Sequence, residues 1–440
     1  MHPETSPALL NRPNYVILVV PLVLDRLHRK IRRSKKLTKL LLGNSIWFPL
    51  SSQSDAVKQR GKRVTTLAPE SPLPPISSLA CIGPPLTRVD RPKDPTHFPS
   101  IEVLRFENAR AYGHSSLIQV RTGHLVHHDL LDPVAHKVSE EEHHRLRIDV
   151  SRLMCQLVGS PLMTVTLPKA AVFTDSVSSN YAHWLTEVLP RIALYARNEC
   201  SEGVPLIVDA GLHPNLYESL SIVIGSARTV YELPVDRRVN VQQLDVVTPT
   251  GYVPYAARPP KRAGHSHGMF SAEALWAVRD ACKHLMPMVG VHAGKRIYVR
   301  RNSGFRKLVN DQQISDSLAA AGFTVIAPEE LSFSDQVRLF SQAEFVIGAT
   351  GAAMANLIFC PPGSRVHVLM AQHEDMPYWY WQRLADCIGV RLTYGMGEVC
   401  AAHEKGFHAD FTVDVRHIED ALRDAQATQD VHDVRRQSAS

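Results

Sequence analysis

The sequence predicts an α/β protein in which parallel sheets are flanked by helices. Short apolar runs alternate with helical stretches over much of residues 170–395, and this alternation is typical of βαβ units. The 440 residues exceed the length of one typical core, which favours two domains with extensions. With 44% hydrophobic and 21% charged residues, the composition is that of a soluble globular chain.

The segment EFVIGATGAAMANLIFC, residues 344–360, combines a strand, a glycine turn and a helix. Residues 345–347 are predicted as a buried strand, and Thr350 and Gly351 as a sharp turn before the helix. This arrangement directs backbone N–H groups and the positive end of a helix at an anion. Small residues at 349–353 let a ligand approach the backbone closely. Tight strand–helix packing explains the same glycines, so both interpretations stay open.

Basic side chains follow a second predicted strand, residues 296–299, at its carboxyl end. They are Arg300, Arg301, Arg306 and Lys307. Ligands of parallel sheets lie beyond the carboxyl ends of the strands, and fixed cations there suit a diphosphate. The same region has predicted helices at 311–321, 334–342 and 378–388, and predicted strands at 323–326, 365–370 and 391–394.

The net charge of +6 is concentrated near the N-terminus. Residues 26–39 contain eight basic residues and no acidic one, and the remainder has 41 basic and 43 acidic residues. The body of the protein is therefore not a polyanion binder, and no nucleic-acid partner is expected. The seven cysteines form no C-x-x-C pair, which indicates reduced thiols and a cytoplasmic protein without a zinc site.

The N-terminal segment is predicted to touch a membrane without crossing it. Its apolar run at 15–24 is about half the length of a spanning helix, and no signal-peptide cleavage site follows. Val23, Leu27 and Ile31 would form an apolar stripe on a basic helix, so residues 15–42 suit peripheral contact with an anionic surface. A solvated basic linker or a nucleic-acid contact is the alternative.

The following segments divide into a linker and a first α/β domain. Prolines in 51–98 predict a linker without regular structure. Residues 101–131 alternate as antiparallel strands do, and 134–160 are predicted to be charged and then helical. Strands at 170–173, 205–209, 228–233 and 239–247 with a helix at 213–224 make the first domain, a linker spans 249–268, and Ser271 caps a helix to about 286. The tail after Arg423 is predicted to fray.

A helix beginning after Asn180 carries a row of polar residues. Asn180, His183, Glu187 and Arg191 share one face at spacings of three and four, and Asn180 is placed to cap the helix. Pro190 is predicted to end or kink this helix. An ordinary amphipathic helix with a solvated polar face is the alternative.

Three segments together resemble glycosyltransferase family 61. They are NYAHWLTEVLPR at 180–191, RIYVRRNSGFRKLVND at 296–311 and GFTVIAPEELSFSDQVRLFSQAEFVIGATGAAMANLIFCPPGS at 322–364. The resemblance covers roughly residues 100–395 in the same order. It implies a GT-B-like fold, with two Rossmann-like domains facing across a cleft and a variable N-terminal extension. The expected domains are 1–98 (extension and linker), 99–265 (acceptor side), 266–400 (nucleotide-sugar domain) and 401–440 (helix and tail).

The resemblance further implies inverting transfer of a hexose, pentose or N-acetylhexosamine from a nucleotide sugar, with a UDP-sugar expected first. The acceptor would be a hydroxyl of a glycan, glycolipid or protein. No cofactor or bound metal is expected, since no D-x-D pair follows a strand. The predicted catalytic residues are His183, Glu187 and Asp175. The predicted donor-site residues are Arg300, Arg301, Arg306, Lys307, Glu330, Gln336, Thr350, Gly351, Ala352 and Asn356.

One departure from the family pattern keeps alternatives open. Members commonly carry His in the glycine turn, where this chain has Thr350. A non-catalytic protein with a degenerate nucleotide-sugar pocket is therefore the first alternative. A Rossmann oxidoreductase is the second, and it is weakened because no G-x-G-x-x-G follows a strand.

Overall fold

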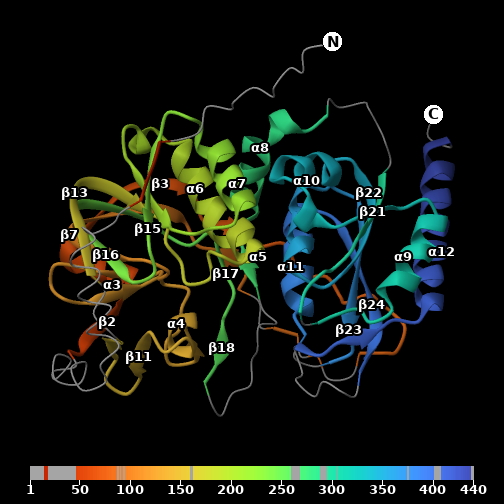
Figure 1. Ribbon diagram of the computed structural model, residues 1–440, viewed down its shortest axis with the longest axis horizontal. Coiled ribbons are helices and arrows are strands. Elements are labelled where there is room, and N and C mark those ends of the chain that lie inside the picture. Colours follow the sequence, from red (N-terminus) through yellow and green to blue (C-terminus); the bar gives the residue numbers. More distant parts are fainter. Residues whose placement is uncertain are drawn as a thin grey trace, which may run out of the picture. The chain divides into compact units, whose positions relative to one another are not determined.

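The computed structural model describes residues 14–17, 46–86, 89, 91–92, 95–158, 162–258, 268–287, 295–304, 306–373, 376–400 and 408–437. They form two compact units (Figure 1). The first unit contains the described residues up to Pro69, Ser100–Ser179 and Glu187–Thr250. The second contains Glu70–Pro99, Asn180–Thr186 and the described residues from Gly251 onward. The basic segment 26–39 lies outside the described residues, so its membrane contact stays a prediction.

A mixed sheet of twelve described strands forms the first unit. The strands β13 (Leu162–Val172), β14 (Leu206–Asp209) and β15 (Thr229–Leu233) are parallel, whereas β7 (Ile101–Tyr112) is antiparallel to β16 (Arg237–Val247). Phe106, Val239 and Leu244 are fully buried in the core of this unit. Along one path the order is β1 (Asn14–Ile17), β15 (Thr229–Leu233), β14 (Leu206–Asp209), β13 (Leu162–Val172), β16 (Arg237–Val247), β7 (Ile101–Tyr112), β8 (Ile118–Gln119), β9 (Leu125–His127), β2 (Phe48–Ser52), β12 (Met154–Leu157) and β11 (Leu146–Asp149), with β3 (Gly61–Ala68) beside β7.

Helices of the first unit connect these strands. The predicted helix 213–224 is confirmed as α7 (Pro214–Ile224), which His213 caps through its side chain. The others are α3 (Gln53–Arg60), α4 (Ser139–Glu142), α6 (Leu189–Ala196) and the short η2 (Glu199–Ser201).

Two predictions for this unit are wrong. Residues 53–68 are not a linker, because Ser52 caps α3 by accepting from the N–H of Asp55, and β3 then pairs with β7. The prolines that suggested a linker lie after this stretch, from Pro69 onward. The predicted helix in 134–160 is reduced to the four residues of α4, and β11 and β12 form an antiparallel pair.

The second unit is a doubly wound sheet. Its parallel strands are β20 (Lys295–Val299), β21 (Thr324–Ile326), β22 (Ala343–Ala349), β23 (Arg365–Ala371) and β24 (Arg391–Val399). Their spatial order is β21-β20-β22-β23-β24, which is 2-1-3-4-5 in chain order. The antiparallel β25 (Phe411–Thr412) and the parallel β5 (Cys81–Ile82) both pair with β24.

Helices cover both faces of this sheet (Figure 1). One face carries α9 (Asp311–Ala320) and α12 (Val415–Gln437), and the other carries α8 (Ala272–Ala281), α10 (Phe333–Phe340) and α11 (Tyr378–Ile388). The tail predicted to fray after Arg423 is helical to Gln437. Among the described residues, no helix combines the length and apolarity needed to cross a membrane. Short elements complete the unit: β4 (Ser71–Pro72), β6 (His97–Phe98), β17 (Gly251–Tyr252), β18 (Ala256–Ala257), β19 (Met269–Phe270), η3 (Lys283–Leu285) and η4 (Pro328–Glu330).

Residues 70–99 belong to the second unit, although they precede the first unit's longest strands in sequence. Ser77 donates from its backbone N–H and its hydroxyl to the carboxylate of Asp386, at 2.9 and 2.7 Å. Arg383 donates to the carbonyl of Pro74 at 2.7 Å. These bonds attach the proline-rich segment to α11, a connection that the sequence pattern did not indicate.

A buried ion pair stabilises the first unit. Arg105 on β7 donates two hydrogen bonds to Asp245 on β16, at 2.5 and 2.8 Å, and the Tyr195 hydroxyl of α6 donates to the same carboxylate at 2.9 Å. Asp245 is fully buried. The carboxylate therefore joins two strands and a helix, and Arg105 is left with a desolvated charge if that carboxylate is lost.

We expect Asp245→Asn to lower the free energy of unfolding by about 3–5 kcal/mol, the usual cost of breaking a buried ion pair from one side. Chemical denaturation followed by circular dichroism measures this loss. The matched control is Asp420→Asn, which breaks the exposed pair with Arg423 and should cost less than about 1 kcal/mol. Equal losses of unfolding free energy in the two variants would show that the buried Asp245 ion pair stabilises the protein no more than an exposed one does.

Candidate functional site

The carboxyl ends of β20 and β22 form the topological switch point of the second unit. The strands pair in parallel, with Val299 opposite Gly348, while β21 and β23 lie on their outer sides. In sheets of this order, ligands bind in the crevice beyond the carboxyl ends at this point. Arg301 follows one of these strands and Gly351 follows the other, so the two predicted segments meet there.

The guanidinium of Arg301 lies directly against Gly351. A Cβ at position 351 would overlap Nη1 of Arg301. Gly351 has an extended backbone, with φ of 173°, so its missing side chain matters for this close approach and not for backbone freedom. Gly348 has a packing role instead, because a Cβ there would lie 2.6 Å from Sδ of Met354. Gly348 therefore supports the packing interpretation, and Gly351 leaves room for the Arg301 side chain, whereas anion binding at the turn stays a prediction.

A second arginine shares this environment. Burial lowers the pKa of Arg306 to about 10, and repulsion from Arg301 adds to the effect. Burial also lowers the pKa of Arg301, although Asp410 opposes the shift. Arg306 further adopts a left-handed backbone with φ of 52°, which is uncommon for a residue other than glycine. Two partly desolvated guanidinium groups near each other favour an anion between or beside them.

The other two predicted cations have different surroundings. Arg300 donates to Asp311 at 2.7 Å, and the Tyr298 hydroxyl donates to the same carboxylate at 2.6 Å. The side chain of Lys307 is exposed, and its backbone N–H donates to Asp410 at 2.8 Å. The four basic residues therefore do not form one cluster: Arg300 fixes the start of α9, whereas Arg301 and Arg306 lie together.

Thr350, in the glycine turn, forms hydrogen bonds within the second unit through both its backbone and its side chain. The N–H of Thr350 donates to the carbonyl of Leu369 at 2.9 Å, and its hydroxyl accepts from Nε1 of Trp381 at 3.1 Å. Thr350 is fully buried, so the backbone donor that the sequence assigned to a phosphate is already bonded. Ala352 opens the 3-10 helix η5 (Ala352–Phe359), which replaces the predicted α-helix.

Gln336 and Asn356, predicted to touch the donor, bond to each other. Nδ2 of Asn356 donates to Oε1 of Gln336 at 2.6 Å, and both side chains are buried. The hydroxyl of Tyr181 lies 2.7 Å from Oδ1 of Asn356 and 3.2 Å from Oε1 of Gln336. These contacts hold α5 (Tyr181–His183) against η5 and α10 within the second unit. Glu330, at the end of η4, is exposed.

The helix after Asn180 begins as predicted. The Asn180 side chain accepts from the N–H groups of Ala182 and His183. The chain stays helical past Pro190, but the regular α-helix is interrupted just before it, because a π-helical segment, η1 (Trp184–Val188), separates α5 from α6. Pro190 lies in the first turn of α6, where a backbone N–H has no partner within the helix, so the missing proline donor costs little there. The carbonyl of Glu187, one residue before the N-cap of α6 at Val188, accepts from Nε of Arg191 at 2.9 Å.

The predicted catalytic residues are divided between the units. His183 is half-buried in the segment that belongs to the second unit, whereas Glu187 is buried in the first. Asp175 also belongs to the first unit, where it accepts from Nη2 of Arg191 at 2.9 Å. That ion pair joins the loop of Asp175 to α6, which contains Arg191, and so gives both residues a structural role.

Sequence reasoning missed the carboxylate that organises this loop. Asp209, at the end of β14, is fully buried and accepts from the Ser178 hydroxyl and from the N–H groups of His114 and Asp175, at 2.6, 2.5 and 2.9 Å. Burial raises the pKa of Asp209 to about 6, while these bonds favour its charged form. An acid ending an apolar strand was the available signal. Tyr181 was missed because its ring fits the apolar face of the helix.

The fold and the arginine crevice define an α/β protein suited to binding an anion at the switch point. Residues 181–367 match the family model described as Glycosyltransferase 61. The match extends from the helix of Tyr181, through β20 and β22, to β23, and it confirms the resemblance to glycosyltransferase family 61 over the segment that carries the crevice. It supports glycosyltransferase activity, with a sugar donor and a glycan acceptor in general terms. No curated protein matches the chain.

Proposed function

We propose that the protein is an inverting glycosyltransferase that uses a nucleotide-diphosphate sugar, with a UDP-sugar as the first candidate. The proposal rests on one observation above all: Arg301 lies against Gly351 at the switch point of the doubly wound sheet. A diphosphate beside Arg301 and Arg306 would offset the desolvation of both cations. A GT-B arrangement of the two α/β units is part of this proposal.

The proposed reaction is a single displacement at the anomeric carbon. The acceptor oxygen forms a bond to that carbon while the bond to the diphosphate oxygen breaks, and the nucleoside diphosphate leaves. The acceptor proton passes to a general base, for which an imidazole has a suitable pKa. Arg301 and Arg306 stabilise the negative charge that develops on the departing diphosphate. Glu330 and Lys307, both exposed, remain candidates for contacts with the nucleotide.

Thr350 favours a second candidate, a non-catalytic protein that binds nucleotide sugars. Its hydroxyl and its N–H are both engaged in packing, at the place where family members commonly carry His. Such a protein would bind the donor and release it unchanged.

The arginines give the first test. We expect Arg301→Gln to weaken UDP binding by about 1.5–3 kcal/mol, roughly 10- to 150-fold in Kd, because hydrogen bonds to a charged group are lost. Isothermal titration calorimetry measures this change. Arg300→Gln is the matched control: it should lower the melting temperature by breaking the pair with Asp311 and leave the UDP affinity unchanged. The opposite pattern would assign the diphosphate to Arg300.

His183 gives the second test. His183→Ala should lower turnover at least about 100-fold while donor affinity stays near that of the wild type, because only the acceptance of the proton is lost. Sugar transfer from UDP-sugars is measured by release of UDP. Glu187→Gln and Asp175→Asn are made in parallel, and loss of turnover in only one of them, at an unchanged melting temperature, would identify that residue as the base. Donor binding without turnover in the wild-type chain would favour the non-catalytic candidate.

Membrane contact through residues 15–42 is a further part of the proposal, since it would bring the enzyme to glycolipid acceptors. Replacing the eight basic residues of 26–39 by Gln in the full chain should abolish sedimentation with anionic liposomes, at about 1 kcal/mol for each lost charge. The full chain is used because β1 (Asn14–Ile17) pairs with β15, so a truncation would also remove a strand. Equal sedimentation of both chains would exclude an electrostatic membrane contact.

A further inference from the structure

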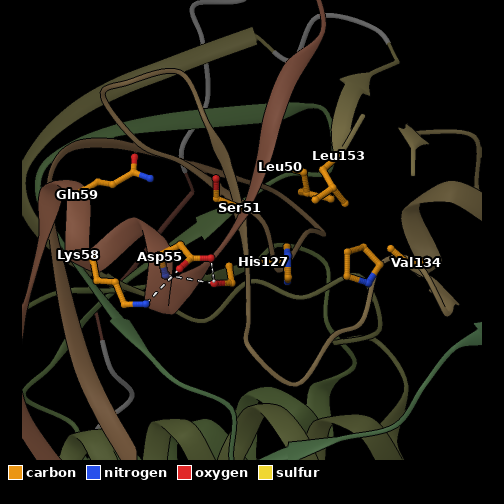
Figure 2. Close-up of a pocket in the computed structure, with 10 residues that line it drawn as sticks. Leu50, Ser51, Asp55, Lys58, Gln59, His127, Val134 and Leu153 are labelled. Carbon is orange, nitrogen blue, oxygen red and sulfur yellow. Dashed lines mark hydrogen bonds and ion pairs between the residues drawn. The ribbon is translucent and has the colours of Figure 1, made fainter. Parts of the chain in front are cut away.

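A pocket of about 530 Å³ lies in the first unit, and all of its lining residues precede the segment matched by the family model in sequence (Figure 2). Its size falls within the range of small-molecule sites. It is formed by the end of β2, the exposed side of α3, the end of β9 and two loops. Its lining residues are Leu50, Ser51, Ser52, Asp55, Lys58, Gln59, His127, Pro133, Val134 and Leu153.

His127 contributes a neutral hydrogen-bonding ring. Its Nδ1 lies 2.8 Å from the carbonyl of His128, which can only accept, so Nδ1 carries the proton. His127 is buried, and burial lowers its pKa, so the ring is neutral near pH 7. The second nitrogen, Nε2, is then an acceptor. The Ser51 hydroxyl is bonded to Nδ1 of His124 at 2.7 Å, and the Ser52 hydroxyl donates to the Asp55 carboxylate at 3.0 Å, so each serine offers a ligand a remaining lone pair. The amide of Gln59, which also lines the pocket, can both donate and accept.

The charges of the pocket cancel. Lys58 pairs with Asp55 at 3.3 Å, and both side chains are exposed. Hydrogen bonds from Ser52 and Lys58 hold the pKa of Asp55 below its usual value, so the carboxylate stays charged. The negative charges of Asp129 and Asp132 oppose the effect of burial by raising the pKa of His127. An anionic ligand would therefore meet no uncompensated cation among these lining groups, and a neutral ligand fits better.

Apolar side chains adjoin these polar groups. Val134 and Leu153 are 56% and 45% exposed, and both line the pocket. Leu153 has a left-handed backbone with φ of 49°, and its carbonyl accepts from the N–H of Leu50 at 2.8 Å. The left-handed conformation is strained for a residue as bulky as leucine, and strained backbone of this kind is common at functional sites.

We propose that this pocket binds a neutral saccharide. A sugar ring presents hydroxyl groups along its edge and C–H groups on its faces. The edge would hydrogen-bond to His127, the serines and Gln59, and a face would cover Val134 and Leu153. The inference rests on the pocket alone, and it gives the first unit a carbohydrate site that is independent of the diphosphate crevice.

Saturation-transfer difference NMR on the full chain tests this site. The probes are cellobiose, maltose, lactose, xylobiose and N,N′-diacetylchitobiose, with glucosamine, glucuronic acid and inorganic phosphate as charged comparisons. At least one neutral disaccharide should bind saturably. Val134→Ala should weaken it about fivefold, which corresponds to losing roughly half the burial contribution of a valine. Val235→Ala, at an equally exposed valine outside the pocket, should leave binding unchanged.

Leu153→Gly is the variant that best separates binding from folding. Glycine adopts a positive φ readily, so the fold should be retained while the apolar side chain is removed. Weaker disaccharide binding at an unchanged melting temperature would support the site. Binding unaffected by both pocket variants, binding of only the charged probes, or no binding of any neutral probe would each overturn it.

The outcome is separable from that of the proposed function. Arg301→Gln should leave disaccharide binding intact, and the two pocket variants should leave UDP binding intact. A chain that binds a disaccharide but no nucleotide would retain this inference while the proposed function fails.

Discussion

The contact between the Arg301 guanidinium and Gly351 is the constraint on which the second unit's site depends. It exists because position 351 has no side chain and because β20 and β22 are neighbours in the sheet. Burial lowers the pKa of both Arg301 and Arg306, and repulsion from Arg301 adds to the shift of Arg306. Residues with shifted pKa values at a topological switch point are candidates for a ligand site.

Several packing interactions hold this contact in place. Gly348 allows β22 to approach Met354 and Val299, which sets the position of the turn that follows. The bonds of Thr350 to Leu369 and Trp381 then fix the turn against β23 and α11. Further along, the buried side chains of Gln336, Asn356 and Tyr181 join α10, η5 and α5. The position of Arg301 beside Gly351 thus depends on packing throughout the second unit and not on one loop.

The sequence predicted the elements of the second unit well, because βαβ units combine local periodicity with glycine stops. The helix predicted at 378–388 is α11, and Gly389, at φ of 75°, ends it. The juxtaposition of Arg301 and Gly351 also followed from the rule that parallel strands align their carboxyl ends. Side-chain partners could not be predicted in this way. Whether Arg300 binds a ligand or Asp311 depends on the path of the loop, which no periodicity encodes.

The differences between prediction and structure arise mostly from long-range pairing. Residues 53–68 form a helix and a strand because β7 is available as a partner, and residues 70–99 join the second unit through β24 and Asp386. The helix continues past Pro190 because the π-helical segment ends just before it, which places Pro190 in the first turn of α6. Each of these depends on residues far away in sequence or on a local geometry that composition does not specify.

A crystal structure of the protein with UDP tests the central claim most directly. We expect diphosphate oxygens at about 2.7–2.9 Å from the guanidinium nitrogens of Arg301, the usual distance of a charge-assisted hydrogen bond, with Gly351 beside them. We also expect Arg300 to remain bonded to Asp311. A diphosphate bound to Arg300 and Lys307, with Arg301 still packed on Gly351 and touching no ligand, would contradict it.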